Sequence, residues 1–407
     1  MRFALISLWM VLVSCDSKTQ NPCAEGTERA ESGGCYPVGS SADEEPAGSD
    51  TDTASDTDSD TGDSSPGDTS TAQDEADALR DAAEEFLNAL DADQRDAAQF
   101  DLSDPERRAW SNLPIGDFPR EGARLGDMTE AQRDLAWALV AASLSTRGMQ
   151  RIDDILTMES IVEALGWGGA SLDDYYFVVF DTPSATSPWA WQIDGHHLAM
   201  NFTIVGSEVT MAPSLWGVEP ASWDDGEHAG LEPLGDTLAV ALEWANGLEP
   251  DQLTAAAVGS SSDPDLSFGP QFDSDTWPAI EGLSVTDMTG EQRDSLLSLI
   301  ALYVGNLPPN QAANRMAEIT ESLDGASVVW VGDTEPGSAI YYRIHGPHVL
   351  IEFDHVMGPN HIHSVYRDPS NDYGSDWLSK HLATDHDHDV THHGLHSWGR
   401  THLPSVR

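Results

Sequence analysis

The residues of this sequence best suited to chemistry are histidines and carboxylates in two separated segments. His197 follows a glycine and another histidine in the first segment, and His361 and His363 form a His-Ile-His motif in the second. Glu352 precedes that motif on a stretch with strand-like alternation. Neutral imidazole together with carboxylate is a ligand set for divalent zinc, iron, manganese or copper. We therefore predict a divalent-metal site whose ligands are His197, Glu352, His361 and His363.

The arrangement of the second segment depends on a predicted hairpin. If residues 355–360 form its loop, Asp354 lies opposite His361 and Glu352 lies opposite His363. Two imidazoles and two carboxylates then share one small patch. Such a patch could also be a buried ladder of His–Asp and His–Glu pairs that only stabilises the sheet, or a metal-free acid–base site. The sequence leaves these alternatives open.

Three residues near this patch are candidates for catalytic roles. His348 and Asp354 could act as a general acid or base, or could orient a metal ligand. Arg367 could bind an anionic substrate through two parallel hydrogen bonds, or it could pair with Asp368 or Asp372.

The elements that must position these residues occur twice. Residues 127–134 recur as residues 287–294 with six of eight positions identical, and both copies have a capping-box start followed by helical apolar spacing. Residues 191–203, which read as one long strand, match residues 342–354 in the same order. We predict an α+β fold of two related α-α-β-β(-β) halves, with helices packed on antiparallel sheet. The halves cover about residues 125–215 and 285–370.

The start of the chain has the features of a bacterial export signal. A short basic start precedes an apolar stretch, residues 3–13, that is too short to cross a bilayer, which takes about 20 residues. Ser14-Cys15 then resembles a lipobox, so we predict a signal peptide over residues 1–14 and lipidation of Cys15. An ordinary secretory signal is the alternative.

Two segments separate this signal from the folded domain. Residues 15–39 contain Cys23 and Cys35, which we predict to form a disulfide because the protein is expected to be exported. Residues 40–78 are rich in Ser, Thr, Asp, Gly and Pro and contain no Lys or Arg, which predicts a disordered acidic linker. The duplicated domain is then expected over residues 79–390.

The composition limits the partners of the protein. Its 70 Asp and Glu residues against 19 Lys and Arg residues give a net charge of −51. A nucleic-acid binder needs clustered cations, so this class is excluded, and membrane contact is expected through the lipid anchor alone. The expected location is the bacterial cell envelope, facing the periplasm or the cell surface, with an extracellular small molecule or polymer as partner. A His-rich tail, residues 391–407, could collect zinc or copper at a designed site or adventitiously.

The candidate segments together resemble a known family. The Gly-His-His segment with Asn201-Phe202-Thr203, and Glu352-Phe353-Asp354 with the His-Ile-His segment, are similar to motifs of the domain of unknown function 3500 family. The resemblance spans roughly residues 80–390 and implies that both histidine segments belong to the family signature. With the site predicted above, we expect metal-dependent hydrolysis or oxidation of an extracellular molecule. A non-catalytic metal- or ligand-binding lipoprotein is the alternative.

Overall fold

The computed structural model describes residues 27–29, 35–37, 70–166, 169–258 and 265–387. The chain divides into two units, Met1–Asp63 and Ser64–Arg407. The first unit contributes one antiparallel pair, β1 (Thr27–Arg29) with β2 (Cys35–Pro37).

Several predictions for the ends of the chain lie outside the described residues. These are the signal peptide, the lipidation of Cys15, the disulfide through Cys23, most of the linker and the His-rich tail. Within the described part of the chain, no helix is long and apolar enough to cross a membrane.

The second unit combines short strands with helices. The strands are β3 (Gln99–Phe100), β4 (Ala123–Arg124), β5 (Tyr176–Phe180), β6 (Trp189–Gly195), β7 (Leu198–Val205), β8 (Glu208–Thr210), β9 (Ser214–Val218), β10 (Leu283–Ser284), β11 (Ser327–Val331), β12 (Tyr341–His345), β13 (Leu350–His355) and β14 (Ile362–Arg367). The helices are α1 (Ala72–Ala89), α2 (Ala92–Ala98), α3 (Glu130–Ser143), α4 (Thr146–Leu165), α5 (Gly235–Asn246), α6 (Pro250–Ala256), α7 (Gly290–Val304), α8 (Pro309–Ser322) and α9 (Ser375–Asp387).

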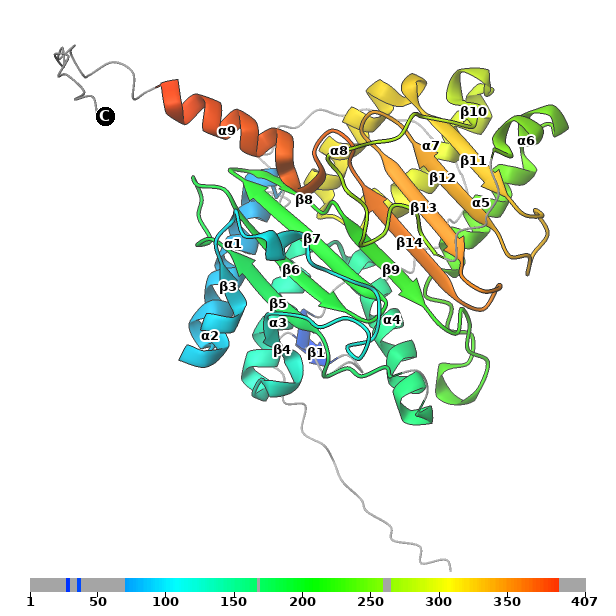
Figure 1. The fold of residues 1–407 in the computed structure, drawn as a ribbon. Coiled ribbons are helices and arrows are strands. Elements are labelled where there is room, and N and C mark those ends of the chain that lie inside the picture. Colours follow the sequence, from blue (N-terminus) through cyan, green and yellow to red (C-terminus); the bar gives the residue numbers. More distant parts are fainter. Residues whose placement is uncertain (1–26, 30–34, 38–69, 167–168, 259–264, 388–407) are drawn as a thin grey trace, which may run out of the picture. The chain divides into compact units, whose positions relative to one another are not determined.

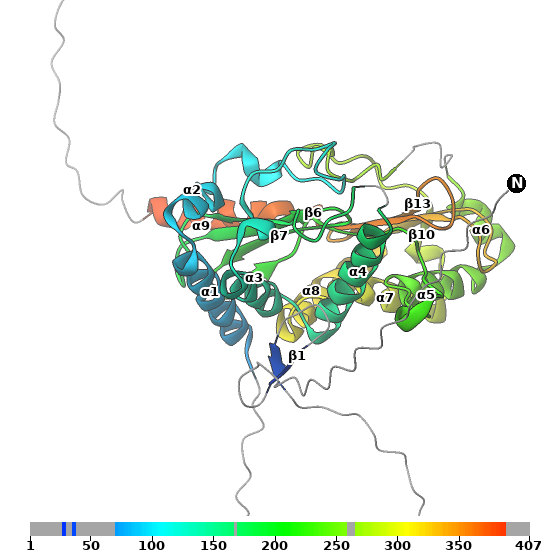
Figure 2. The same cartoon turned by 90° about the horizontal axis from the view of Figure 1, so that it is seen from below.

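One large sheet organises these elements (Figure 1). Its strands run in the order β10-β11-β12-β13-β14-β9-β7-β6-β5-β3, with β4 paired to β5 and β8 paired to β7. The described pairs are antiparallel except β3 with β5. Helices α3, α4, α7 and α8 lie on one face of the sheet, and irregular segments cross the other face (Figure 2). The α+β prediction is therefore confirmed.

The elements follow in the same order in two stretches of this unit. The first stretch runs β4, α3, α4, β5, β6, β7, β8 and β9, and the second runs β10, α7, α8, β11, β12, β13 and β14, so the orders match apart from the short strand β8. Thr129 and Thr289 start α3 and α7 with the predicted capping boxes. The two stretches meet where β9 pairs with β14. The internal duplication itself stays a prediction, which the matching order favours.

The folded region begins earlier than predicted. Helix α1 starts at Ala72, inside the predicted linker, where Thr71 and Asp74 form a capping box. Leu79 and Phe86 are buried on its inner side, and the helix contacts α3. The exposed side of α1 is acidic, so composition alone does not separate it from the linker.

The long strand predicted over residues 191–203 is in fact two strands. β6 and β7 pair with Gly195 opposite Leu198, so His196 and His197 alone form the turn. His197 has φ of 59°, in the left-handed region, where a non-glycine residue costs about 1–3 kcal/mol. The prediction was wrong because it did not use the change of phase in the apolar alternation, from Trp191 and Ile193 to Leu198, Met200 and Phe202.

Both faces of the sheet are covered near the junction of β9 and β14. Trp110 and Phe268 pack on Ala199, Leu215 and Val365 of the sheet. The chain segments around Trp110 and Phe268 cross the face opposite the helices (Figure 2). Trp110 belongs to residues 101–122, the first cover segment, and Phe268 belongs to residues 265–282, the second cover segment. The strand face predicted to carry the ligands is therefore buried beneath these two segments.

Candidate metal centre

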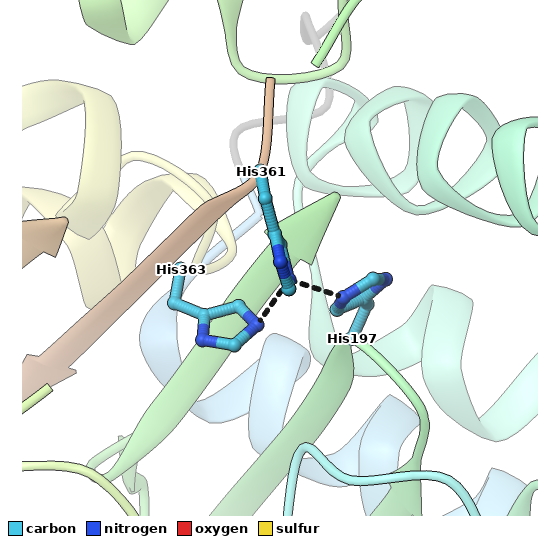
Figure 3. Close-up of side chains that lie close together, drawn as sticks. All are labelled: His197, His361 and His363. Atoms are coloured by element: carbon cyan, nitrogen blue, oxygen red, sulfur yellow. Dashed lines mark hydrogen bonds between the residues drawn. The ribbon is translucent and has the colours of Figure 1, made fainter. Parts of the chain in front are cut away.

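Three histidines from distant parts of the chain converge at one end of the β9–β14 junction (Figure 3). Nε2 of His361 lies 3.1 Å from Nε2 of His197 and 2.9 Å from Nε2 of His363. A ligand atom from each of the three lies within 4.8 Å of the others, so the group could hold a metal ion. The structure thus brings together three of the four residues predicted as ligands.

The ends of three strands position these rings. His197 is in the turn between β6 and β7, His361 comes directly before β14, and His363 is the second residue of β14. Strand β9 lies between them, because Gly217 pairs with His363 and its N–H donates to the carbonyl oxygen of His197 at 2.7 Å. Pairing of β9 with both neighbours therefore sets the distance between the rings.

Gly217 provides the space in which two of the rings approach. A Cβ atom at this position would lie 3.0 Å from Cδ2 of His197 and 3.0 Å from Cδ2 of His363. Any larger residue would push both rings away from β9. A glycine inside a strand often marks such a close approach.

Carboxylates hold the outer nitrogens of the imidazoles. Nδ1 of His197 donates to Glu159 on α4 at 2.7 Å, and Nδ1 of His363 donates to Asp265 at 2.7 Å. Nδ1 of His361 lies 3.5 Å from a carboxylate oxygen of Glu219, which is longer than a hydrogen bond. Carboxylates behind imidazoles in this way fix the tautomer and orientation of metal-binding histidines.

The electrostatics favour neutral rings and charged carboxylates. Burial lowers the pKa of His197 to about 3 and that of His361 to about 4. Burial alone would raise the pKa of Glu159, but its hydrogen bonds with His196 and His197 bring it to about 2. Burial alone would likewise raise the pKa of Asp265, but its hydrogen bond with His363 helps to bring that pKa below its ordinary value. At neutral pH the imidazoles of His197 and His361 are therefore neutral and can present lone pairs.

The three imidazole rings by themselves do not carry enough hydrogens for their own acceptor nitrogens. A neutral imidazole has one N–H, and His197 and His363 use theirs at Nδ1, so both Nε2 atoms are bare. A proton on Nε2 of His361 could bond to one of them, and the three rings hold no hydrogen for the other. The Asn112 amide, whose Nδ2 lies 3.4 Å from Nε2 of His363, is the donor in reach of that atom. A cation among the three nitrogens would accept all three lone pairs.

The nitrogen separations match those of a coordination shell. With metal–nitrogen bonds of about 2.0–2.1 Å, neighbouring ligands lie about 3.3 Å apart in a tetrahedron and about 2.9 Å apart in an octahedron. The distances of 3.1 and 2.9 Å fall at these values.

Glu352, the fourth predicted ligand, does not join the cluster. The register differs from the prediction, because Asp354 pairs with His363 and Glu352 pairs with Val365. The fully buried Glu352 carboxylate accepts hydrogen bonds from the backbone N–H groups of Ser267 and Phe268 at 3.0 and 2.8 Å, and from the Tyr341 hydroxyl at 2.8 Å. It therefore holds the second cover segment, which begins with Asp265. Burial raises the pKa of Glu352 to about 7 despite these bonds.

Arg367 holds the same segment and is not placed to bind a substrate. Its guanidinium pairs with Asp372 at 2.6 Å and donates to the carbonyl oxygens of Phe268 and Gly269 at 2.6 and 2.8 Å. The side chain is fully buried. Of the two alternatives in the sequence, the structure shows the pairing with Asp372.

The remaining predicted residues lie at different distances from the cluster. His348 precedes β13, at the end of that strand away from His363, where its Nδ1 contacts the Ser370 hydroxyl at 2.7 Å. Asp354 is buried and sits opposite His363 in the sheet. His196 lies beside His197 and shares Glu159, which makes these three residues a second group that could hold a metal ion.

Sequence reasoning missed the residues that support the rings. Glu159 had a detectable signal, since a carboxylate stands four residues after Ile155 and three before Val162 in the apolar stripe of a predicted helix. Asp265 and Asn112 had none, because they lie in irregular cover segments without periodicity.

Fold and site together define an α+β protein with a three-histidine centre between two similarly ordered stretches of chain. A protein family described as a protein of unknown function (DUF3500) matches residues 72–375, and because this is more than half of the chain, the protein belongs to that family. The match begins where α1 begins. No curated protein and no solved structure matches the chain.

Proposed function

We propose that this protein is an exported lipoprotein, anchored to the bacterial cell envelope through Cys15, whose family domain binds one divalent metal ion. His197, His361 and His363 are the ligands. The metal serves hydrolysis or oxidation of an extracellular small molecule or polymer. The observation that carries this proposal is the convergence of three Nε2 atoms from imidazoles whose other nitrogens face carboxylates.

The ligand set is compatible with a catalytic metal ion. Three protein ligands leave at least one coordination position open, where the ion supplies a Lewis acid that polarises a substrate oxygen or activates water. The chain's own residues do the rest: Glu159 and Asp265 orient the rings, and the cover segments limit the access of water.

The geometry also narrows the choice of metal. Imidazole suits zinc, copper and iron, whereas manganese prefers oxygen ligands. With Glu352 occupied elsewhere, the proposed shell is all nitrogen, so zinc, copper or iron fits better than manganese.

Metal analysis of the full-length protein tests the proposal. After dialysis against a weak chelator, we expect the double variant His361→Ala, His363→Ala to hold one metal equivalent fewer than the wild type. His348→Ala, a matched control outside the cluster, should retain it. The tail histidines are present in every variant, so adventitious binding cancels in the comparison. Equal metal content in all three proteins would refute a resident ion.

A non-catalytic role as a metal- or ligand-binding lipoprotein is the second candidate. Burial favours it, because the side chains of His197 and His363 are only 1% and 5% exposed and that of His361 is 14% exposed. Turnover of a substrate panel by the metal-loaded protein, absent in the double histidine variant, would establish the enzyme instead.

A further inference from the structure

The three histidines are surrounded by carboxylates. Glu159 and Asp265 each accept an Nδ1–H at 2.7 Å, and Glu219 lies 3.5 Å from Nδ1 of His361. Among the described residues, no Lys or Arg forms an ion pair or hydrogen bond with these carboxylates or with the three histidines. Three negative charges therefore face the two positive charges of a divalent ion. The surroundings cancel the attraction that the ion would otherwise exert on a further anion.

Arg120, a cation of the first cover segment, is already paired. It lies 3.1 Å from Asp194 and donates to the carbonyl oxygens of Ser111 and Leu113 at 2.7 Å. Both charged side chains are almost fully buried. This pair fixes residues 111–113 and leaves no free cation there for a ligand.

Asn112, between those two carbonyl groups, brings an uncharged amide to the centre. Its Nδ2 lies 3.2 Å from Nδ1 and 3.4 Å from Nε2 of His363, and 3.5 Å from Asp265. The backbone carbonyl oxygen of Asn112 accepts from the backbone N–H of His197 at 3.4 Å. Because Nε2 of His363 is one of the converging atoms, the amide lies beside the position of a bound ion. An N–H donor there can bond to a ligand oxygen without adding charge.

We propose that the centre selects uncharged ligands with an oxygen acceptor, such as a carbonyl or hydroxyl group, over anions such as carboxylates and phosphates. Asn112 donates a hydrogen bond to the ligand oxygen, and Glu159, Asp265 and Glu219 oppose the entry of negative charge. This inference rests on the metal centre proposed above and adds the chemical class of the ligand.

Acetamide and acetate form a matched pair of probes, because they share a shape and differ by one charge. The full-length protein is loaded with one equivalent of cobalt(II), and its visible spectrum is corrected with the double variant His361→Ala, His363→Ala. Each probe is then titrated at low ionic strength. We expect acetamide to bind at least about threefold more tightly than acetate, since unscreened carboxylates oppose the anion.

Two variants and one control separate the contributions of Glu219 and Asn112 to the choice between acetamide and acetate. Glu219→Gln should raise the affinity for acetate about three- to tenfold and leave that for acetamide unchanged, because a half-exposed charge acts through a screened field. Asn112→Ala should weaken acetamide more than acetate. Glu281→Gln, which removes an exposed carboxylate paired with Arg343, should change neither.

The outcomes are distinct from those for the metal itself. Acetate binding as tightly as acetamide, or more tightly, in the wild-type centre would overturn the ligand class while the metal centre stands. A protein with no cobalt spectrum that depends on the three histidines would overturn the proposed function and this inference together.

Discussion

The two ends of strand β14 carry buried polar clusters of opposite design. At the C-terminal end of β14, Arg367 pairs with Asp372, and the next residue, Asp368, pairs with Arg315, so each cation meets an anion. At its start, His361 and His363 meet His197 through like atoms. Each buried charge of the Arg367 cluster is therefore compensated inside the protein. The start of β14 instead turns three imidazole nitrogens toward one point, where the proposed cation would bind.

The largest expected effect tests the cluster around Arg367, at the C-terminal end of β14. Arg367→Met should lower the free energy of unfolding of the metal-free protein by about 3–5 kcal/mol, because Asp372 stays charged and buried without its partner. His361→Ala should cost about 1 kcal/mol or less, since its ring is partly exposed. Urea unfolding followed by tryptophan fluorescence measures both. Similar losses for the two variants would remove the contrast between the ends.

Metal addition tests the three-histidine cluster, at the start of β14. Zinc at a hundred times its dissociation constant should raise the free energy of unfolding of the wild type by about 2.7 kcal/mol, because it binds the native state alone. The same addition should leave His363→Ala nearly unchanged. Unfolding curves with and without zinc provide the measurement, and equal stabilisation of both proteins would place the metal elsewhere.

Removal of a supporting carboxylate should have a smaller effect. Glu159→Gln should weaken metal binding about 10- to 100-fold, because glutamine keeps only one of the two acceptor oxygens that orient His196 and His197 and removes the charge behind them. Glu163→Gln, an exposed carboxylate one turn further along α4, should have no effect. Competition with a coloured chelator gives both affinities. If the two variants bind metal alike, Glu159 does not orient the ligands.

The smallest effect concerns the spacing of the rings. Gly217→Ala should reduce metal affinity several-fold, because its Cβ would displace two imidazoles by a few tenths of an ångström from 3.0 Å contacts. Gly290→Ala, where a Cβ meets nothing within 4 Å, is the matched control. The chelator competition applies again. An unchanged affinity in the first variant would mean that the rings adapt freely.

The sequence predicts the fold class and much of the site because both depend on local patterns. Capping boxes and apolar spacing locate α3 and α7, and two short motifs locate His197, His361 and His363. The match of residues 191–203 with 342–354 places corresponding segments in both stretches, although it does not reveal the turn at His197.

The rest of the site depends on contacts that no local pattern encodes. Strand β13 extends to His355, which pairs with Ile362, so the register is two residues away from the prediction. A shift of two keeps each side chain on its face and changes only its partners. Asp265 and Asn112 reach the centre because the buried side chains of Glu352, Arg367 and Asp194 hold irregular backbone in place. Such anchoring is visible only in three dimensions.

The separation of the ligands along the chain has a consequence for assembly. His197 and His361 are 164 residues apart, and they approach only after β9 has paired with β14. No partly folded stretch contains the complete ligand set, so an ion cannot gather it early and guide folding. With the proposed ligand set, the polypeptide would close first and bind its metal afterwards. Once bound, the ion fastens two remote points of the chain, as a removable cross-link would.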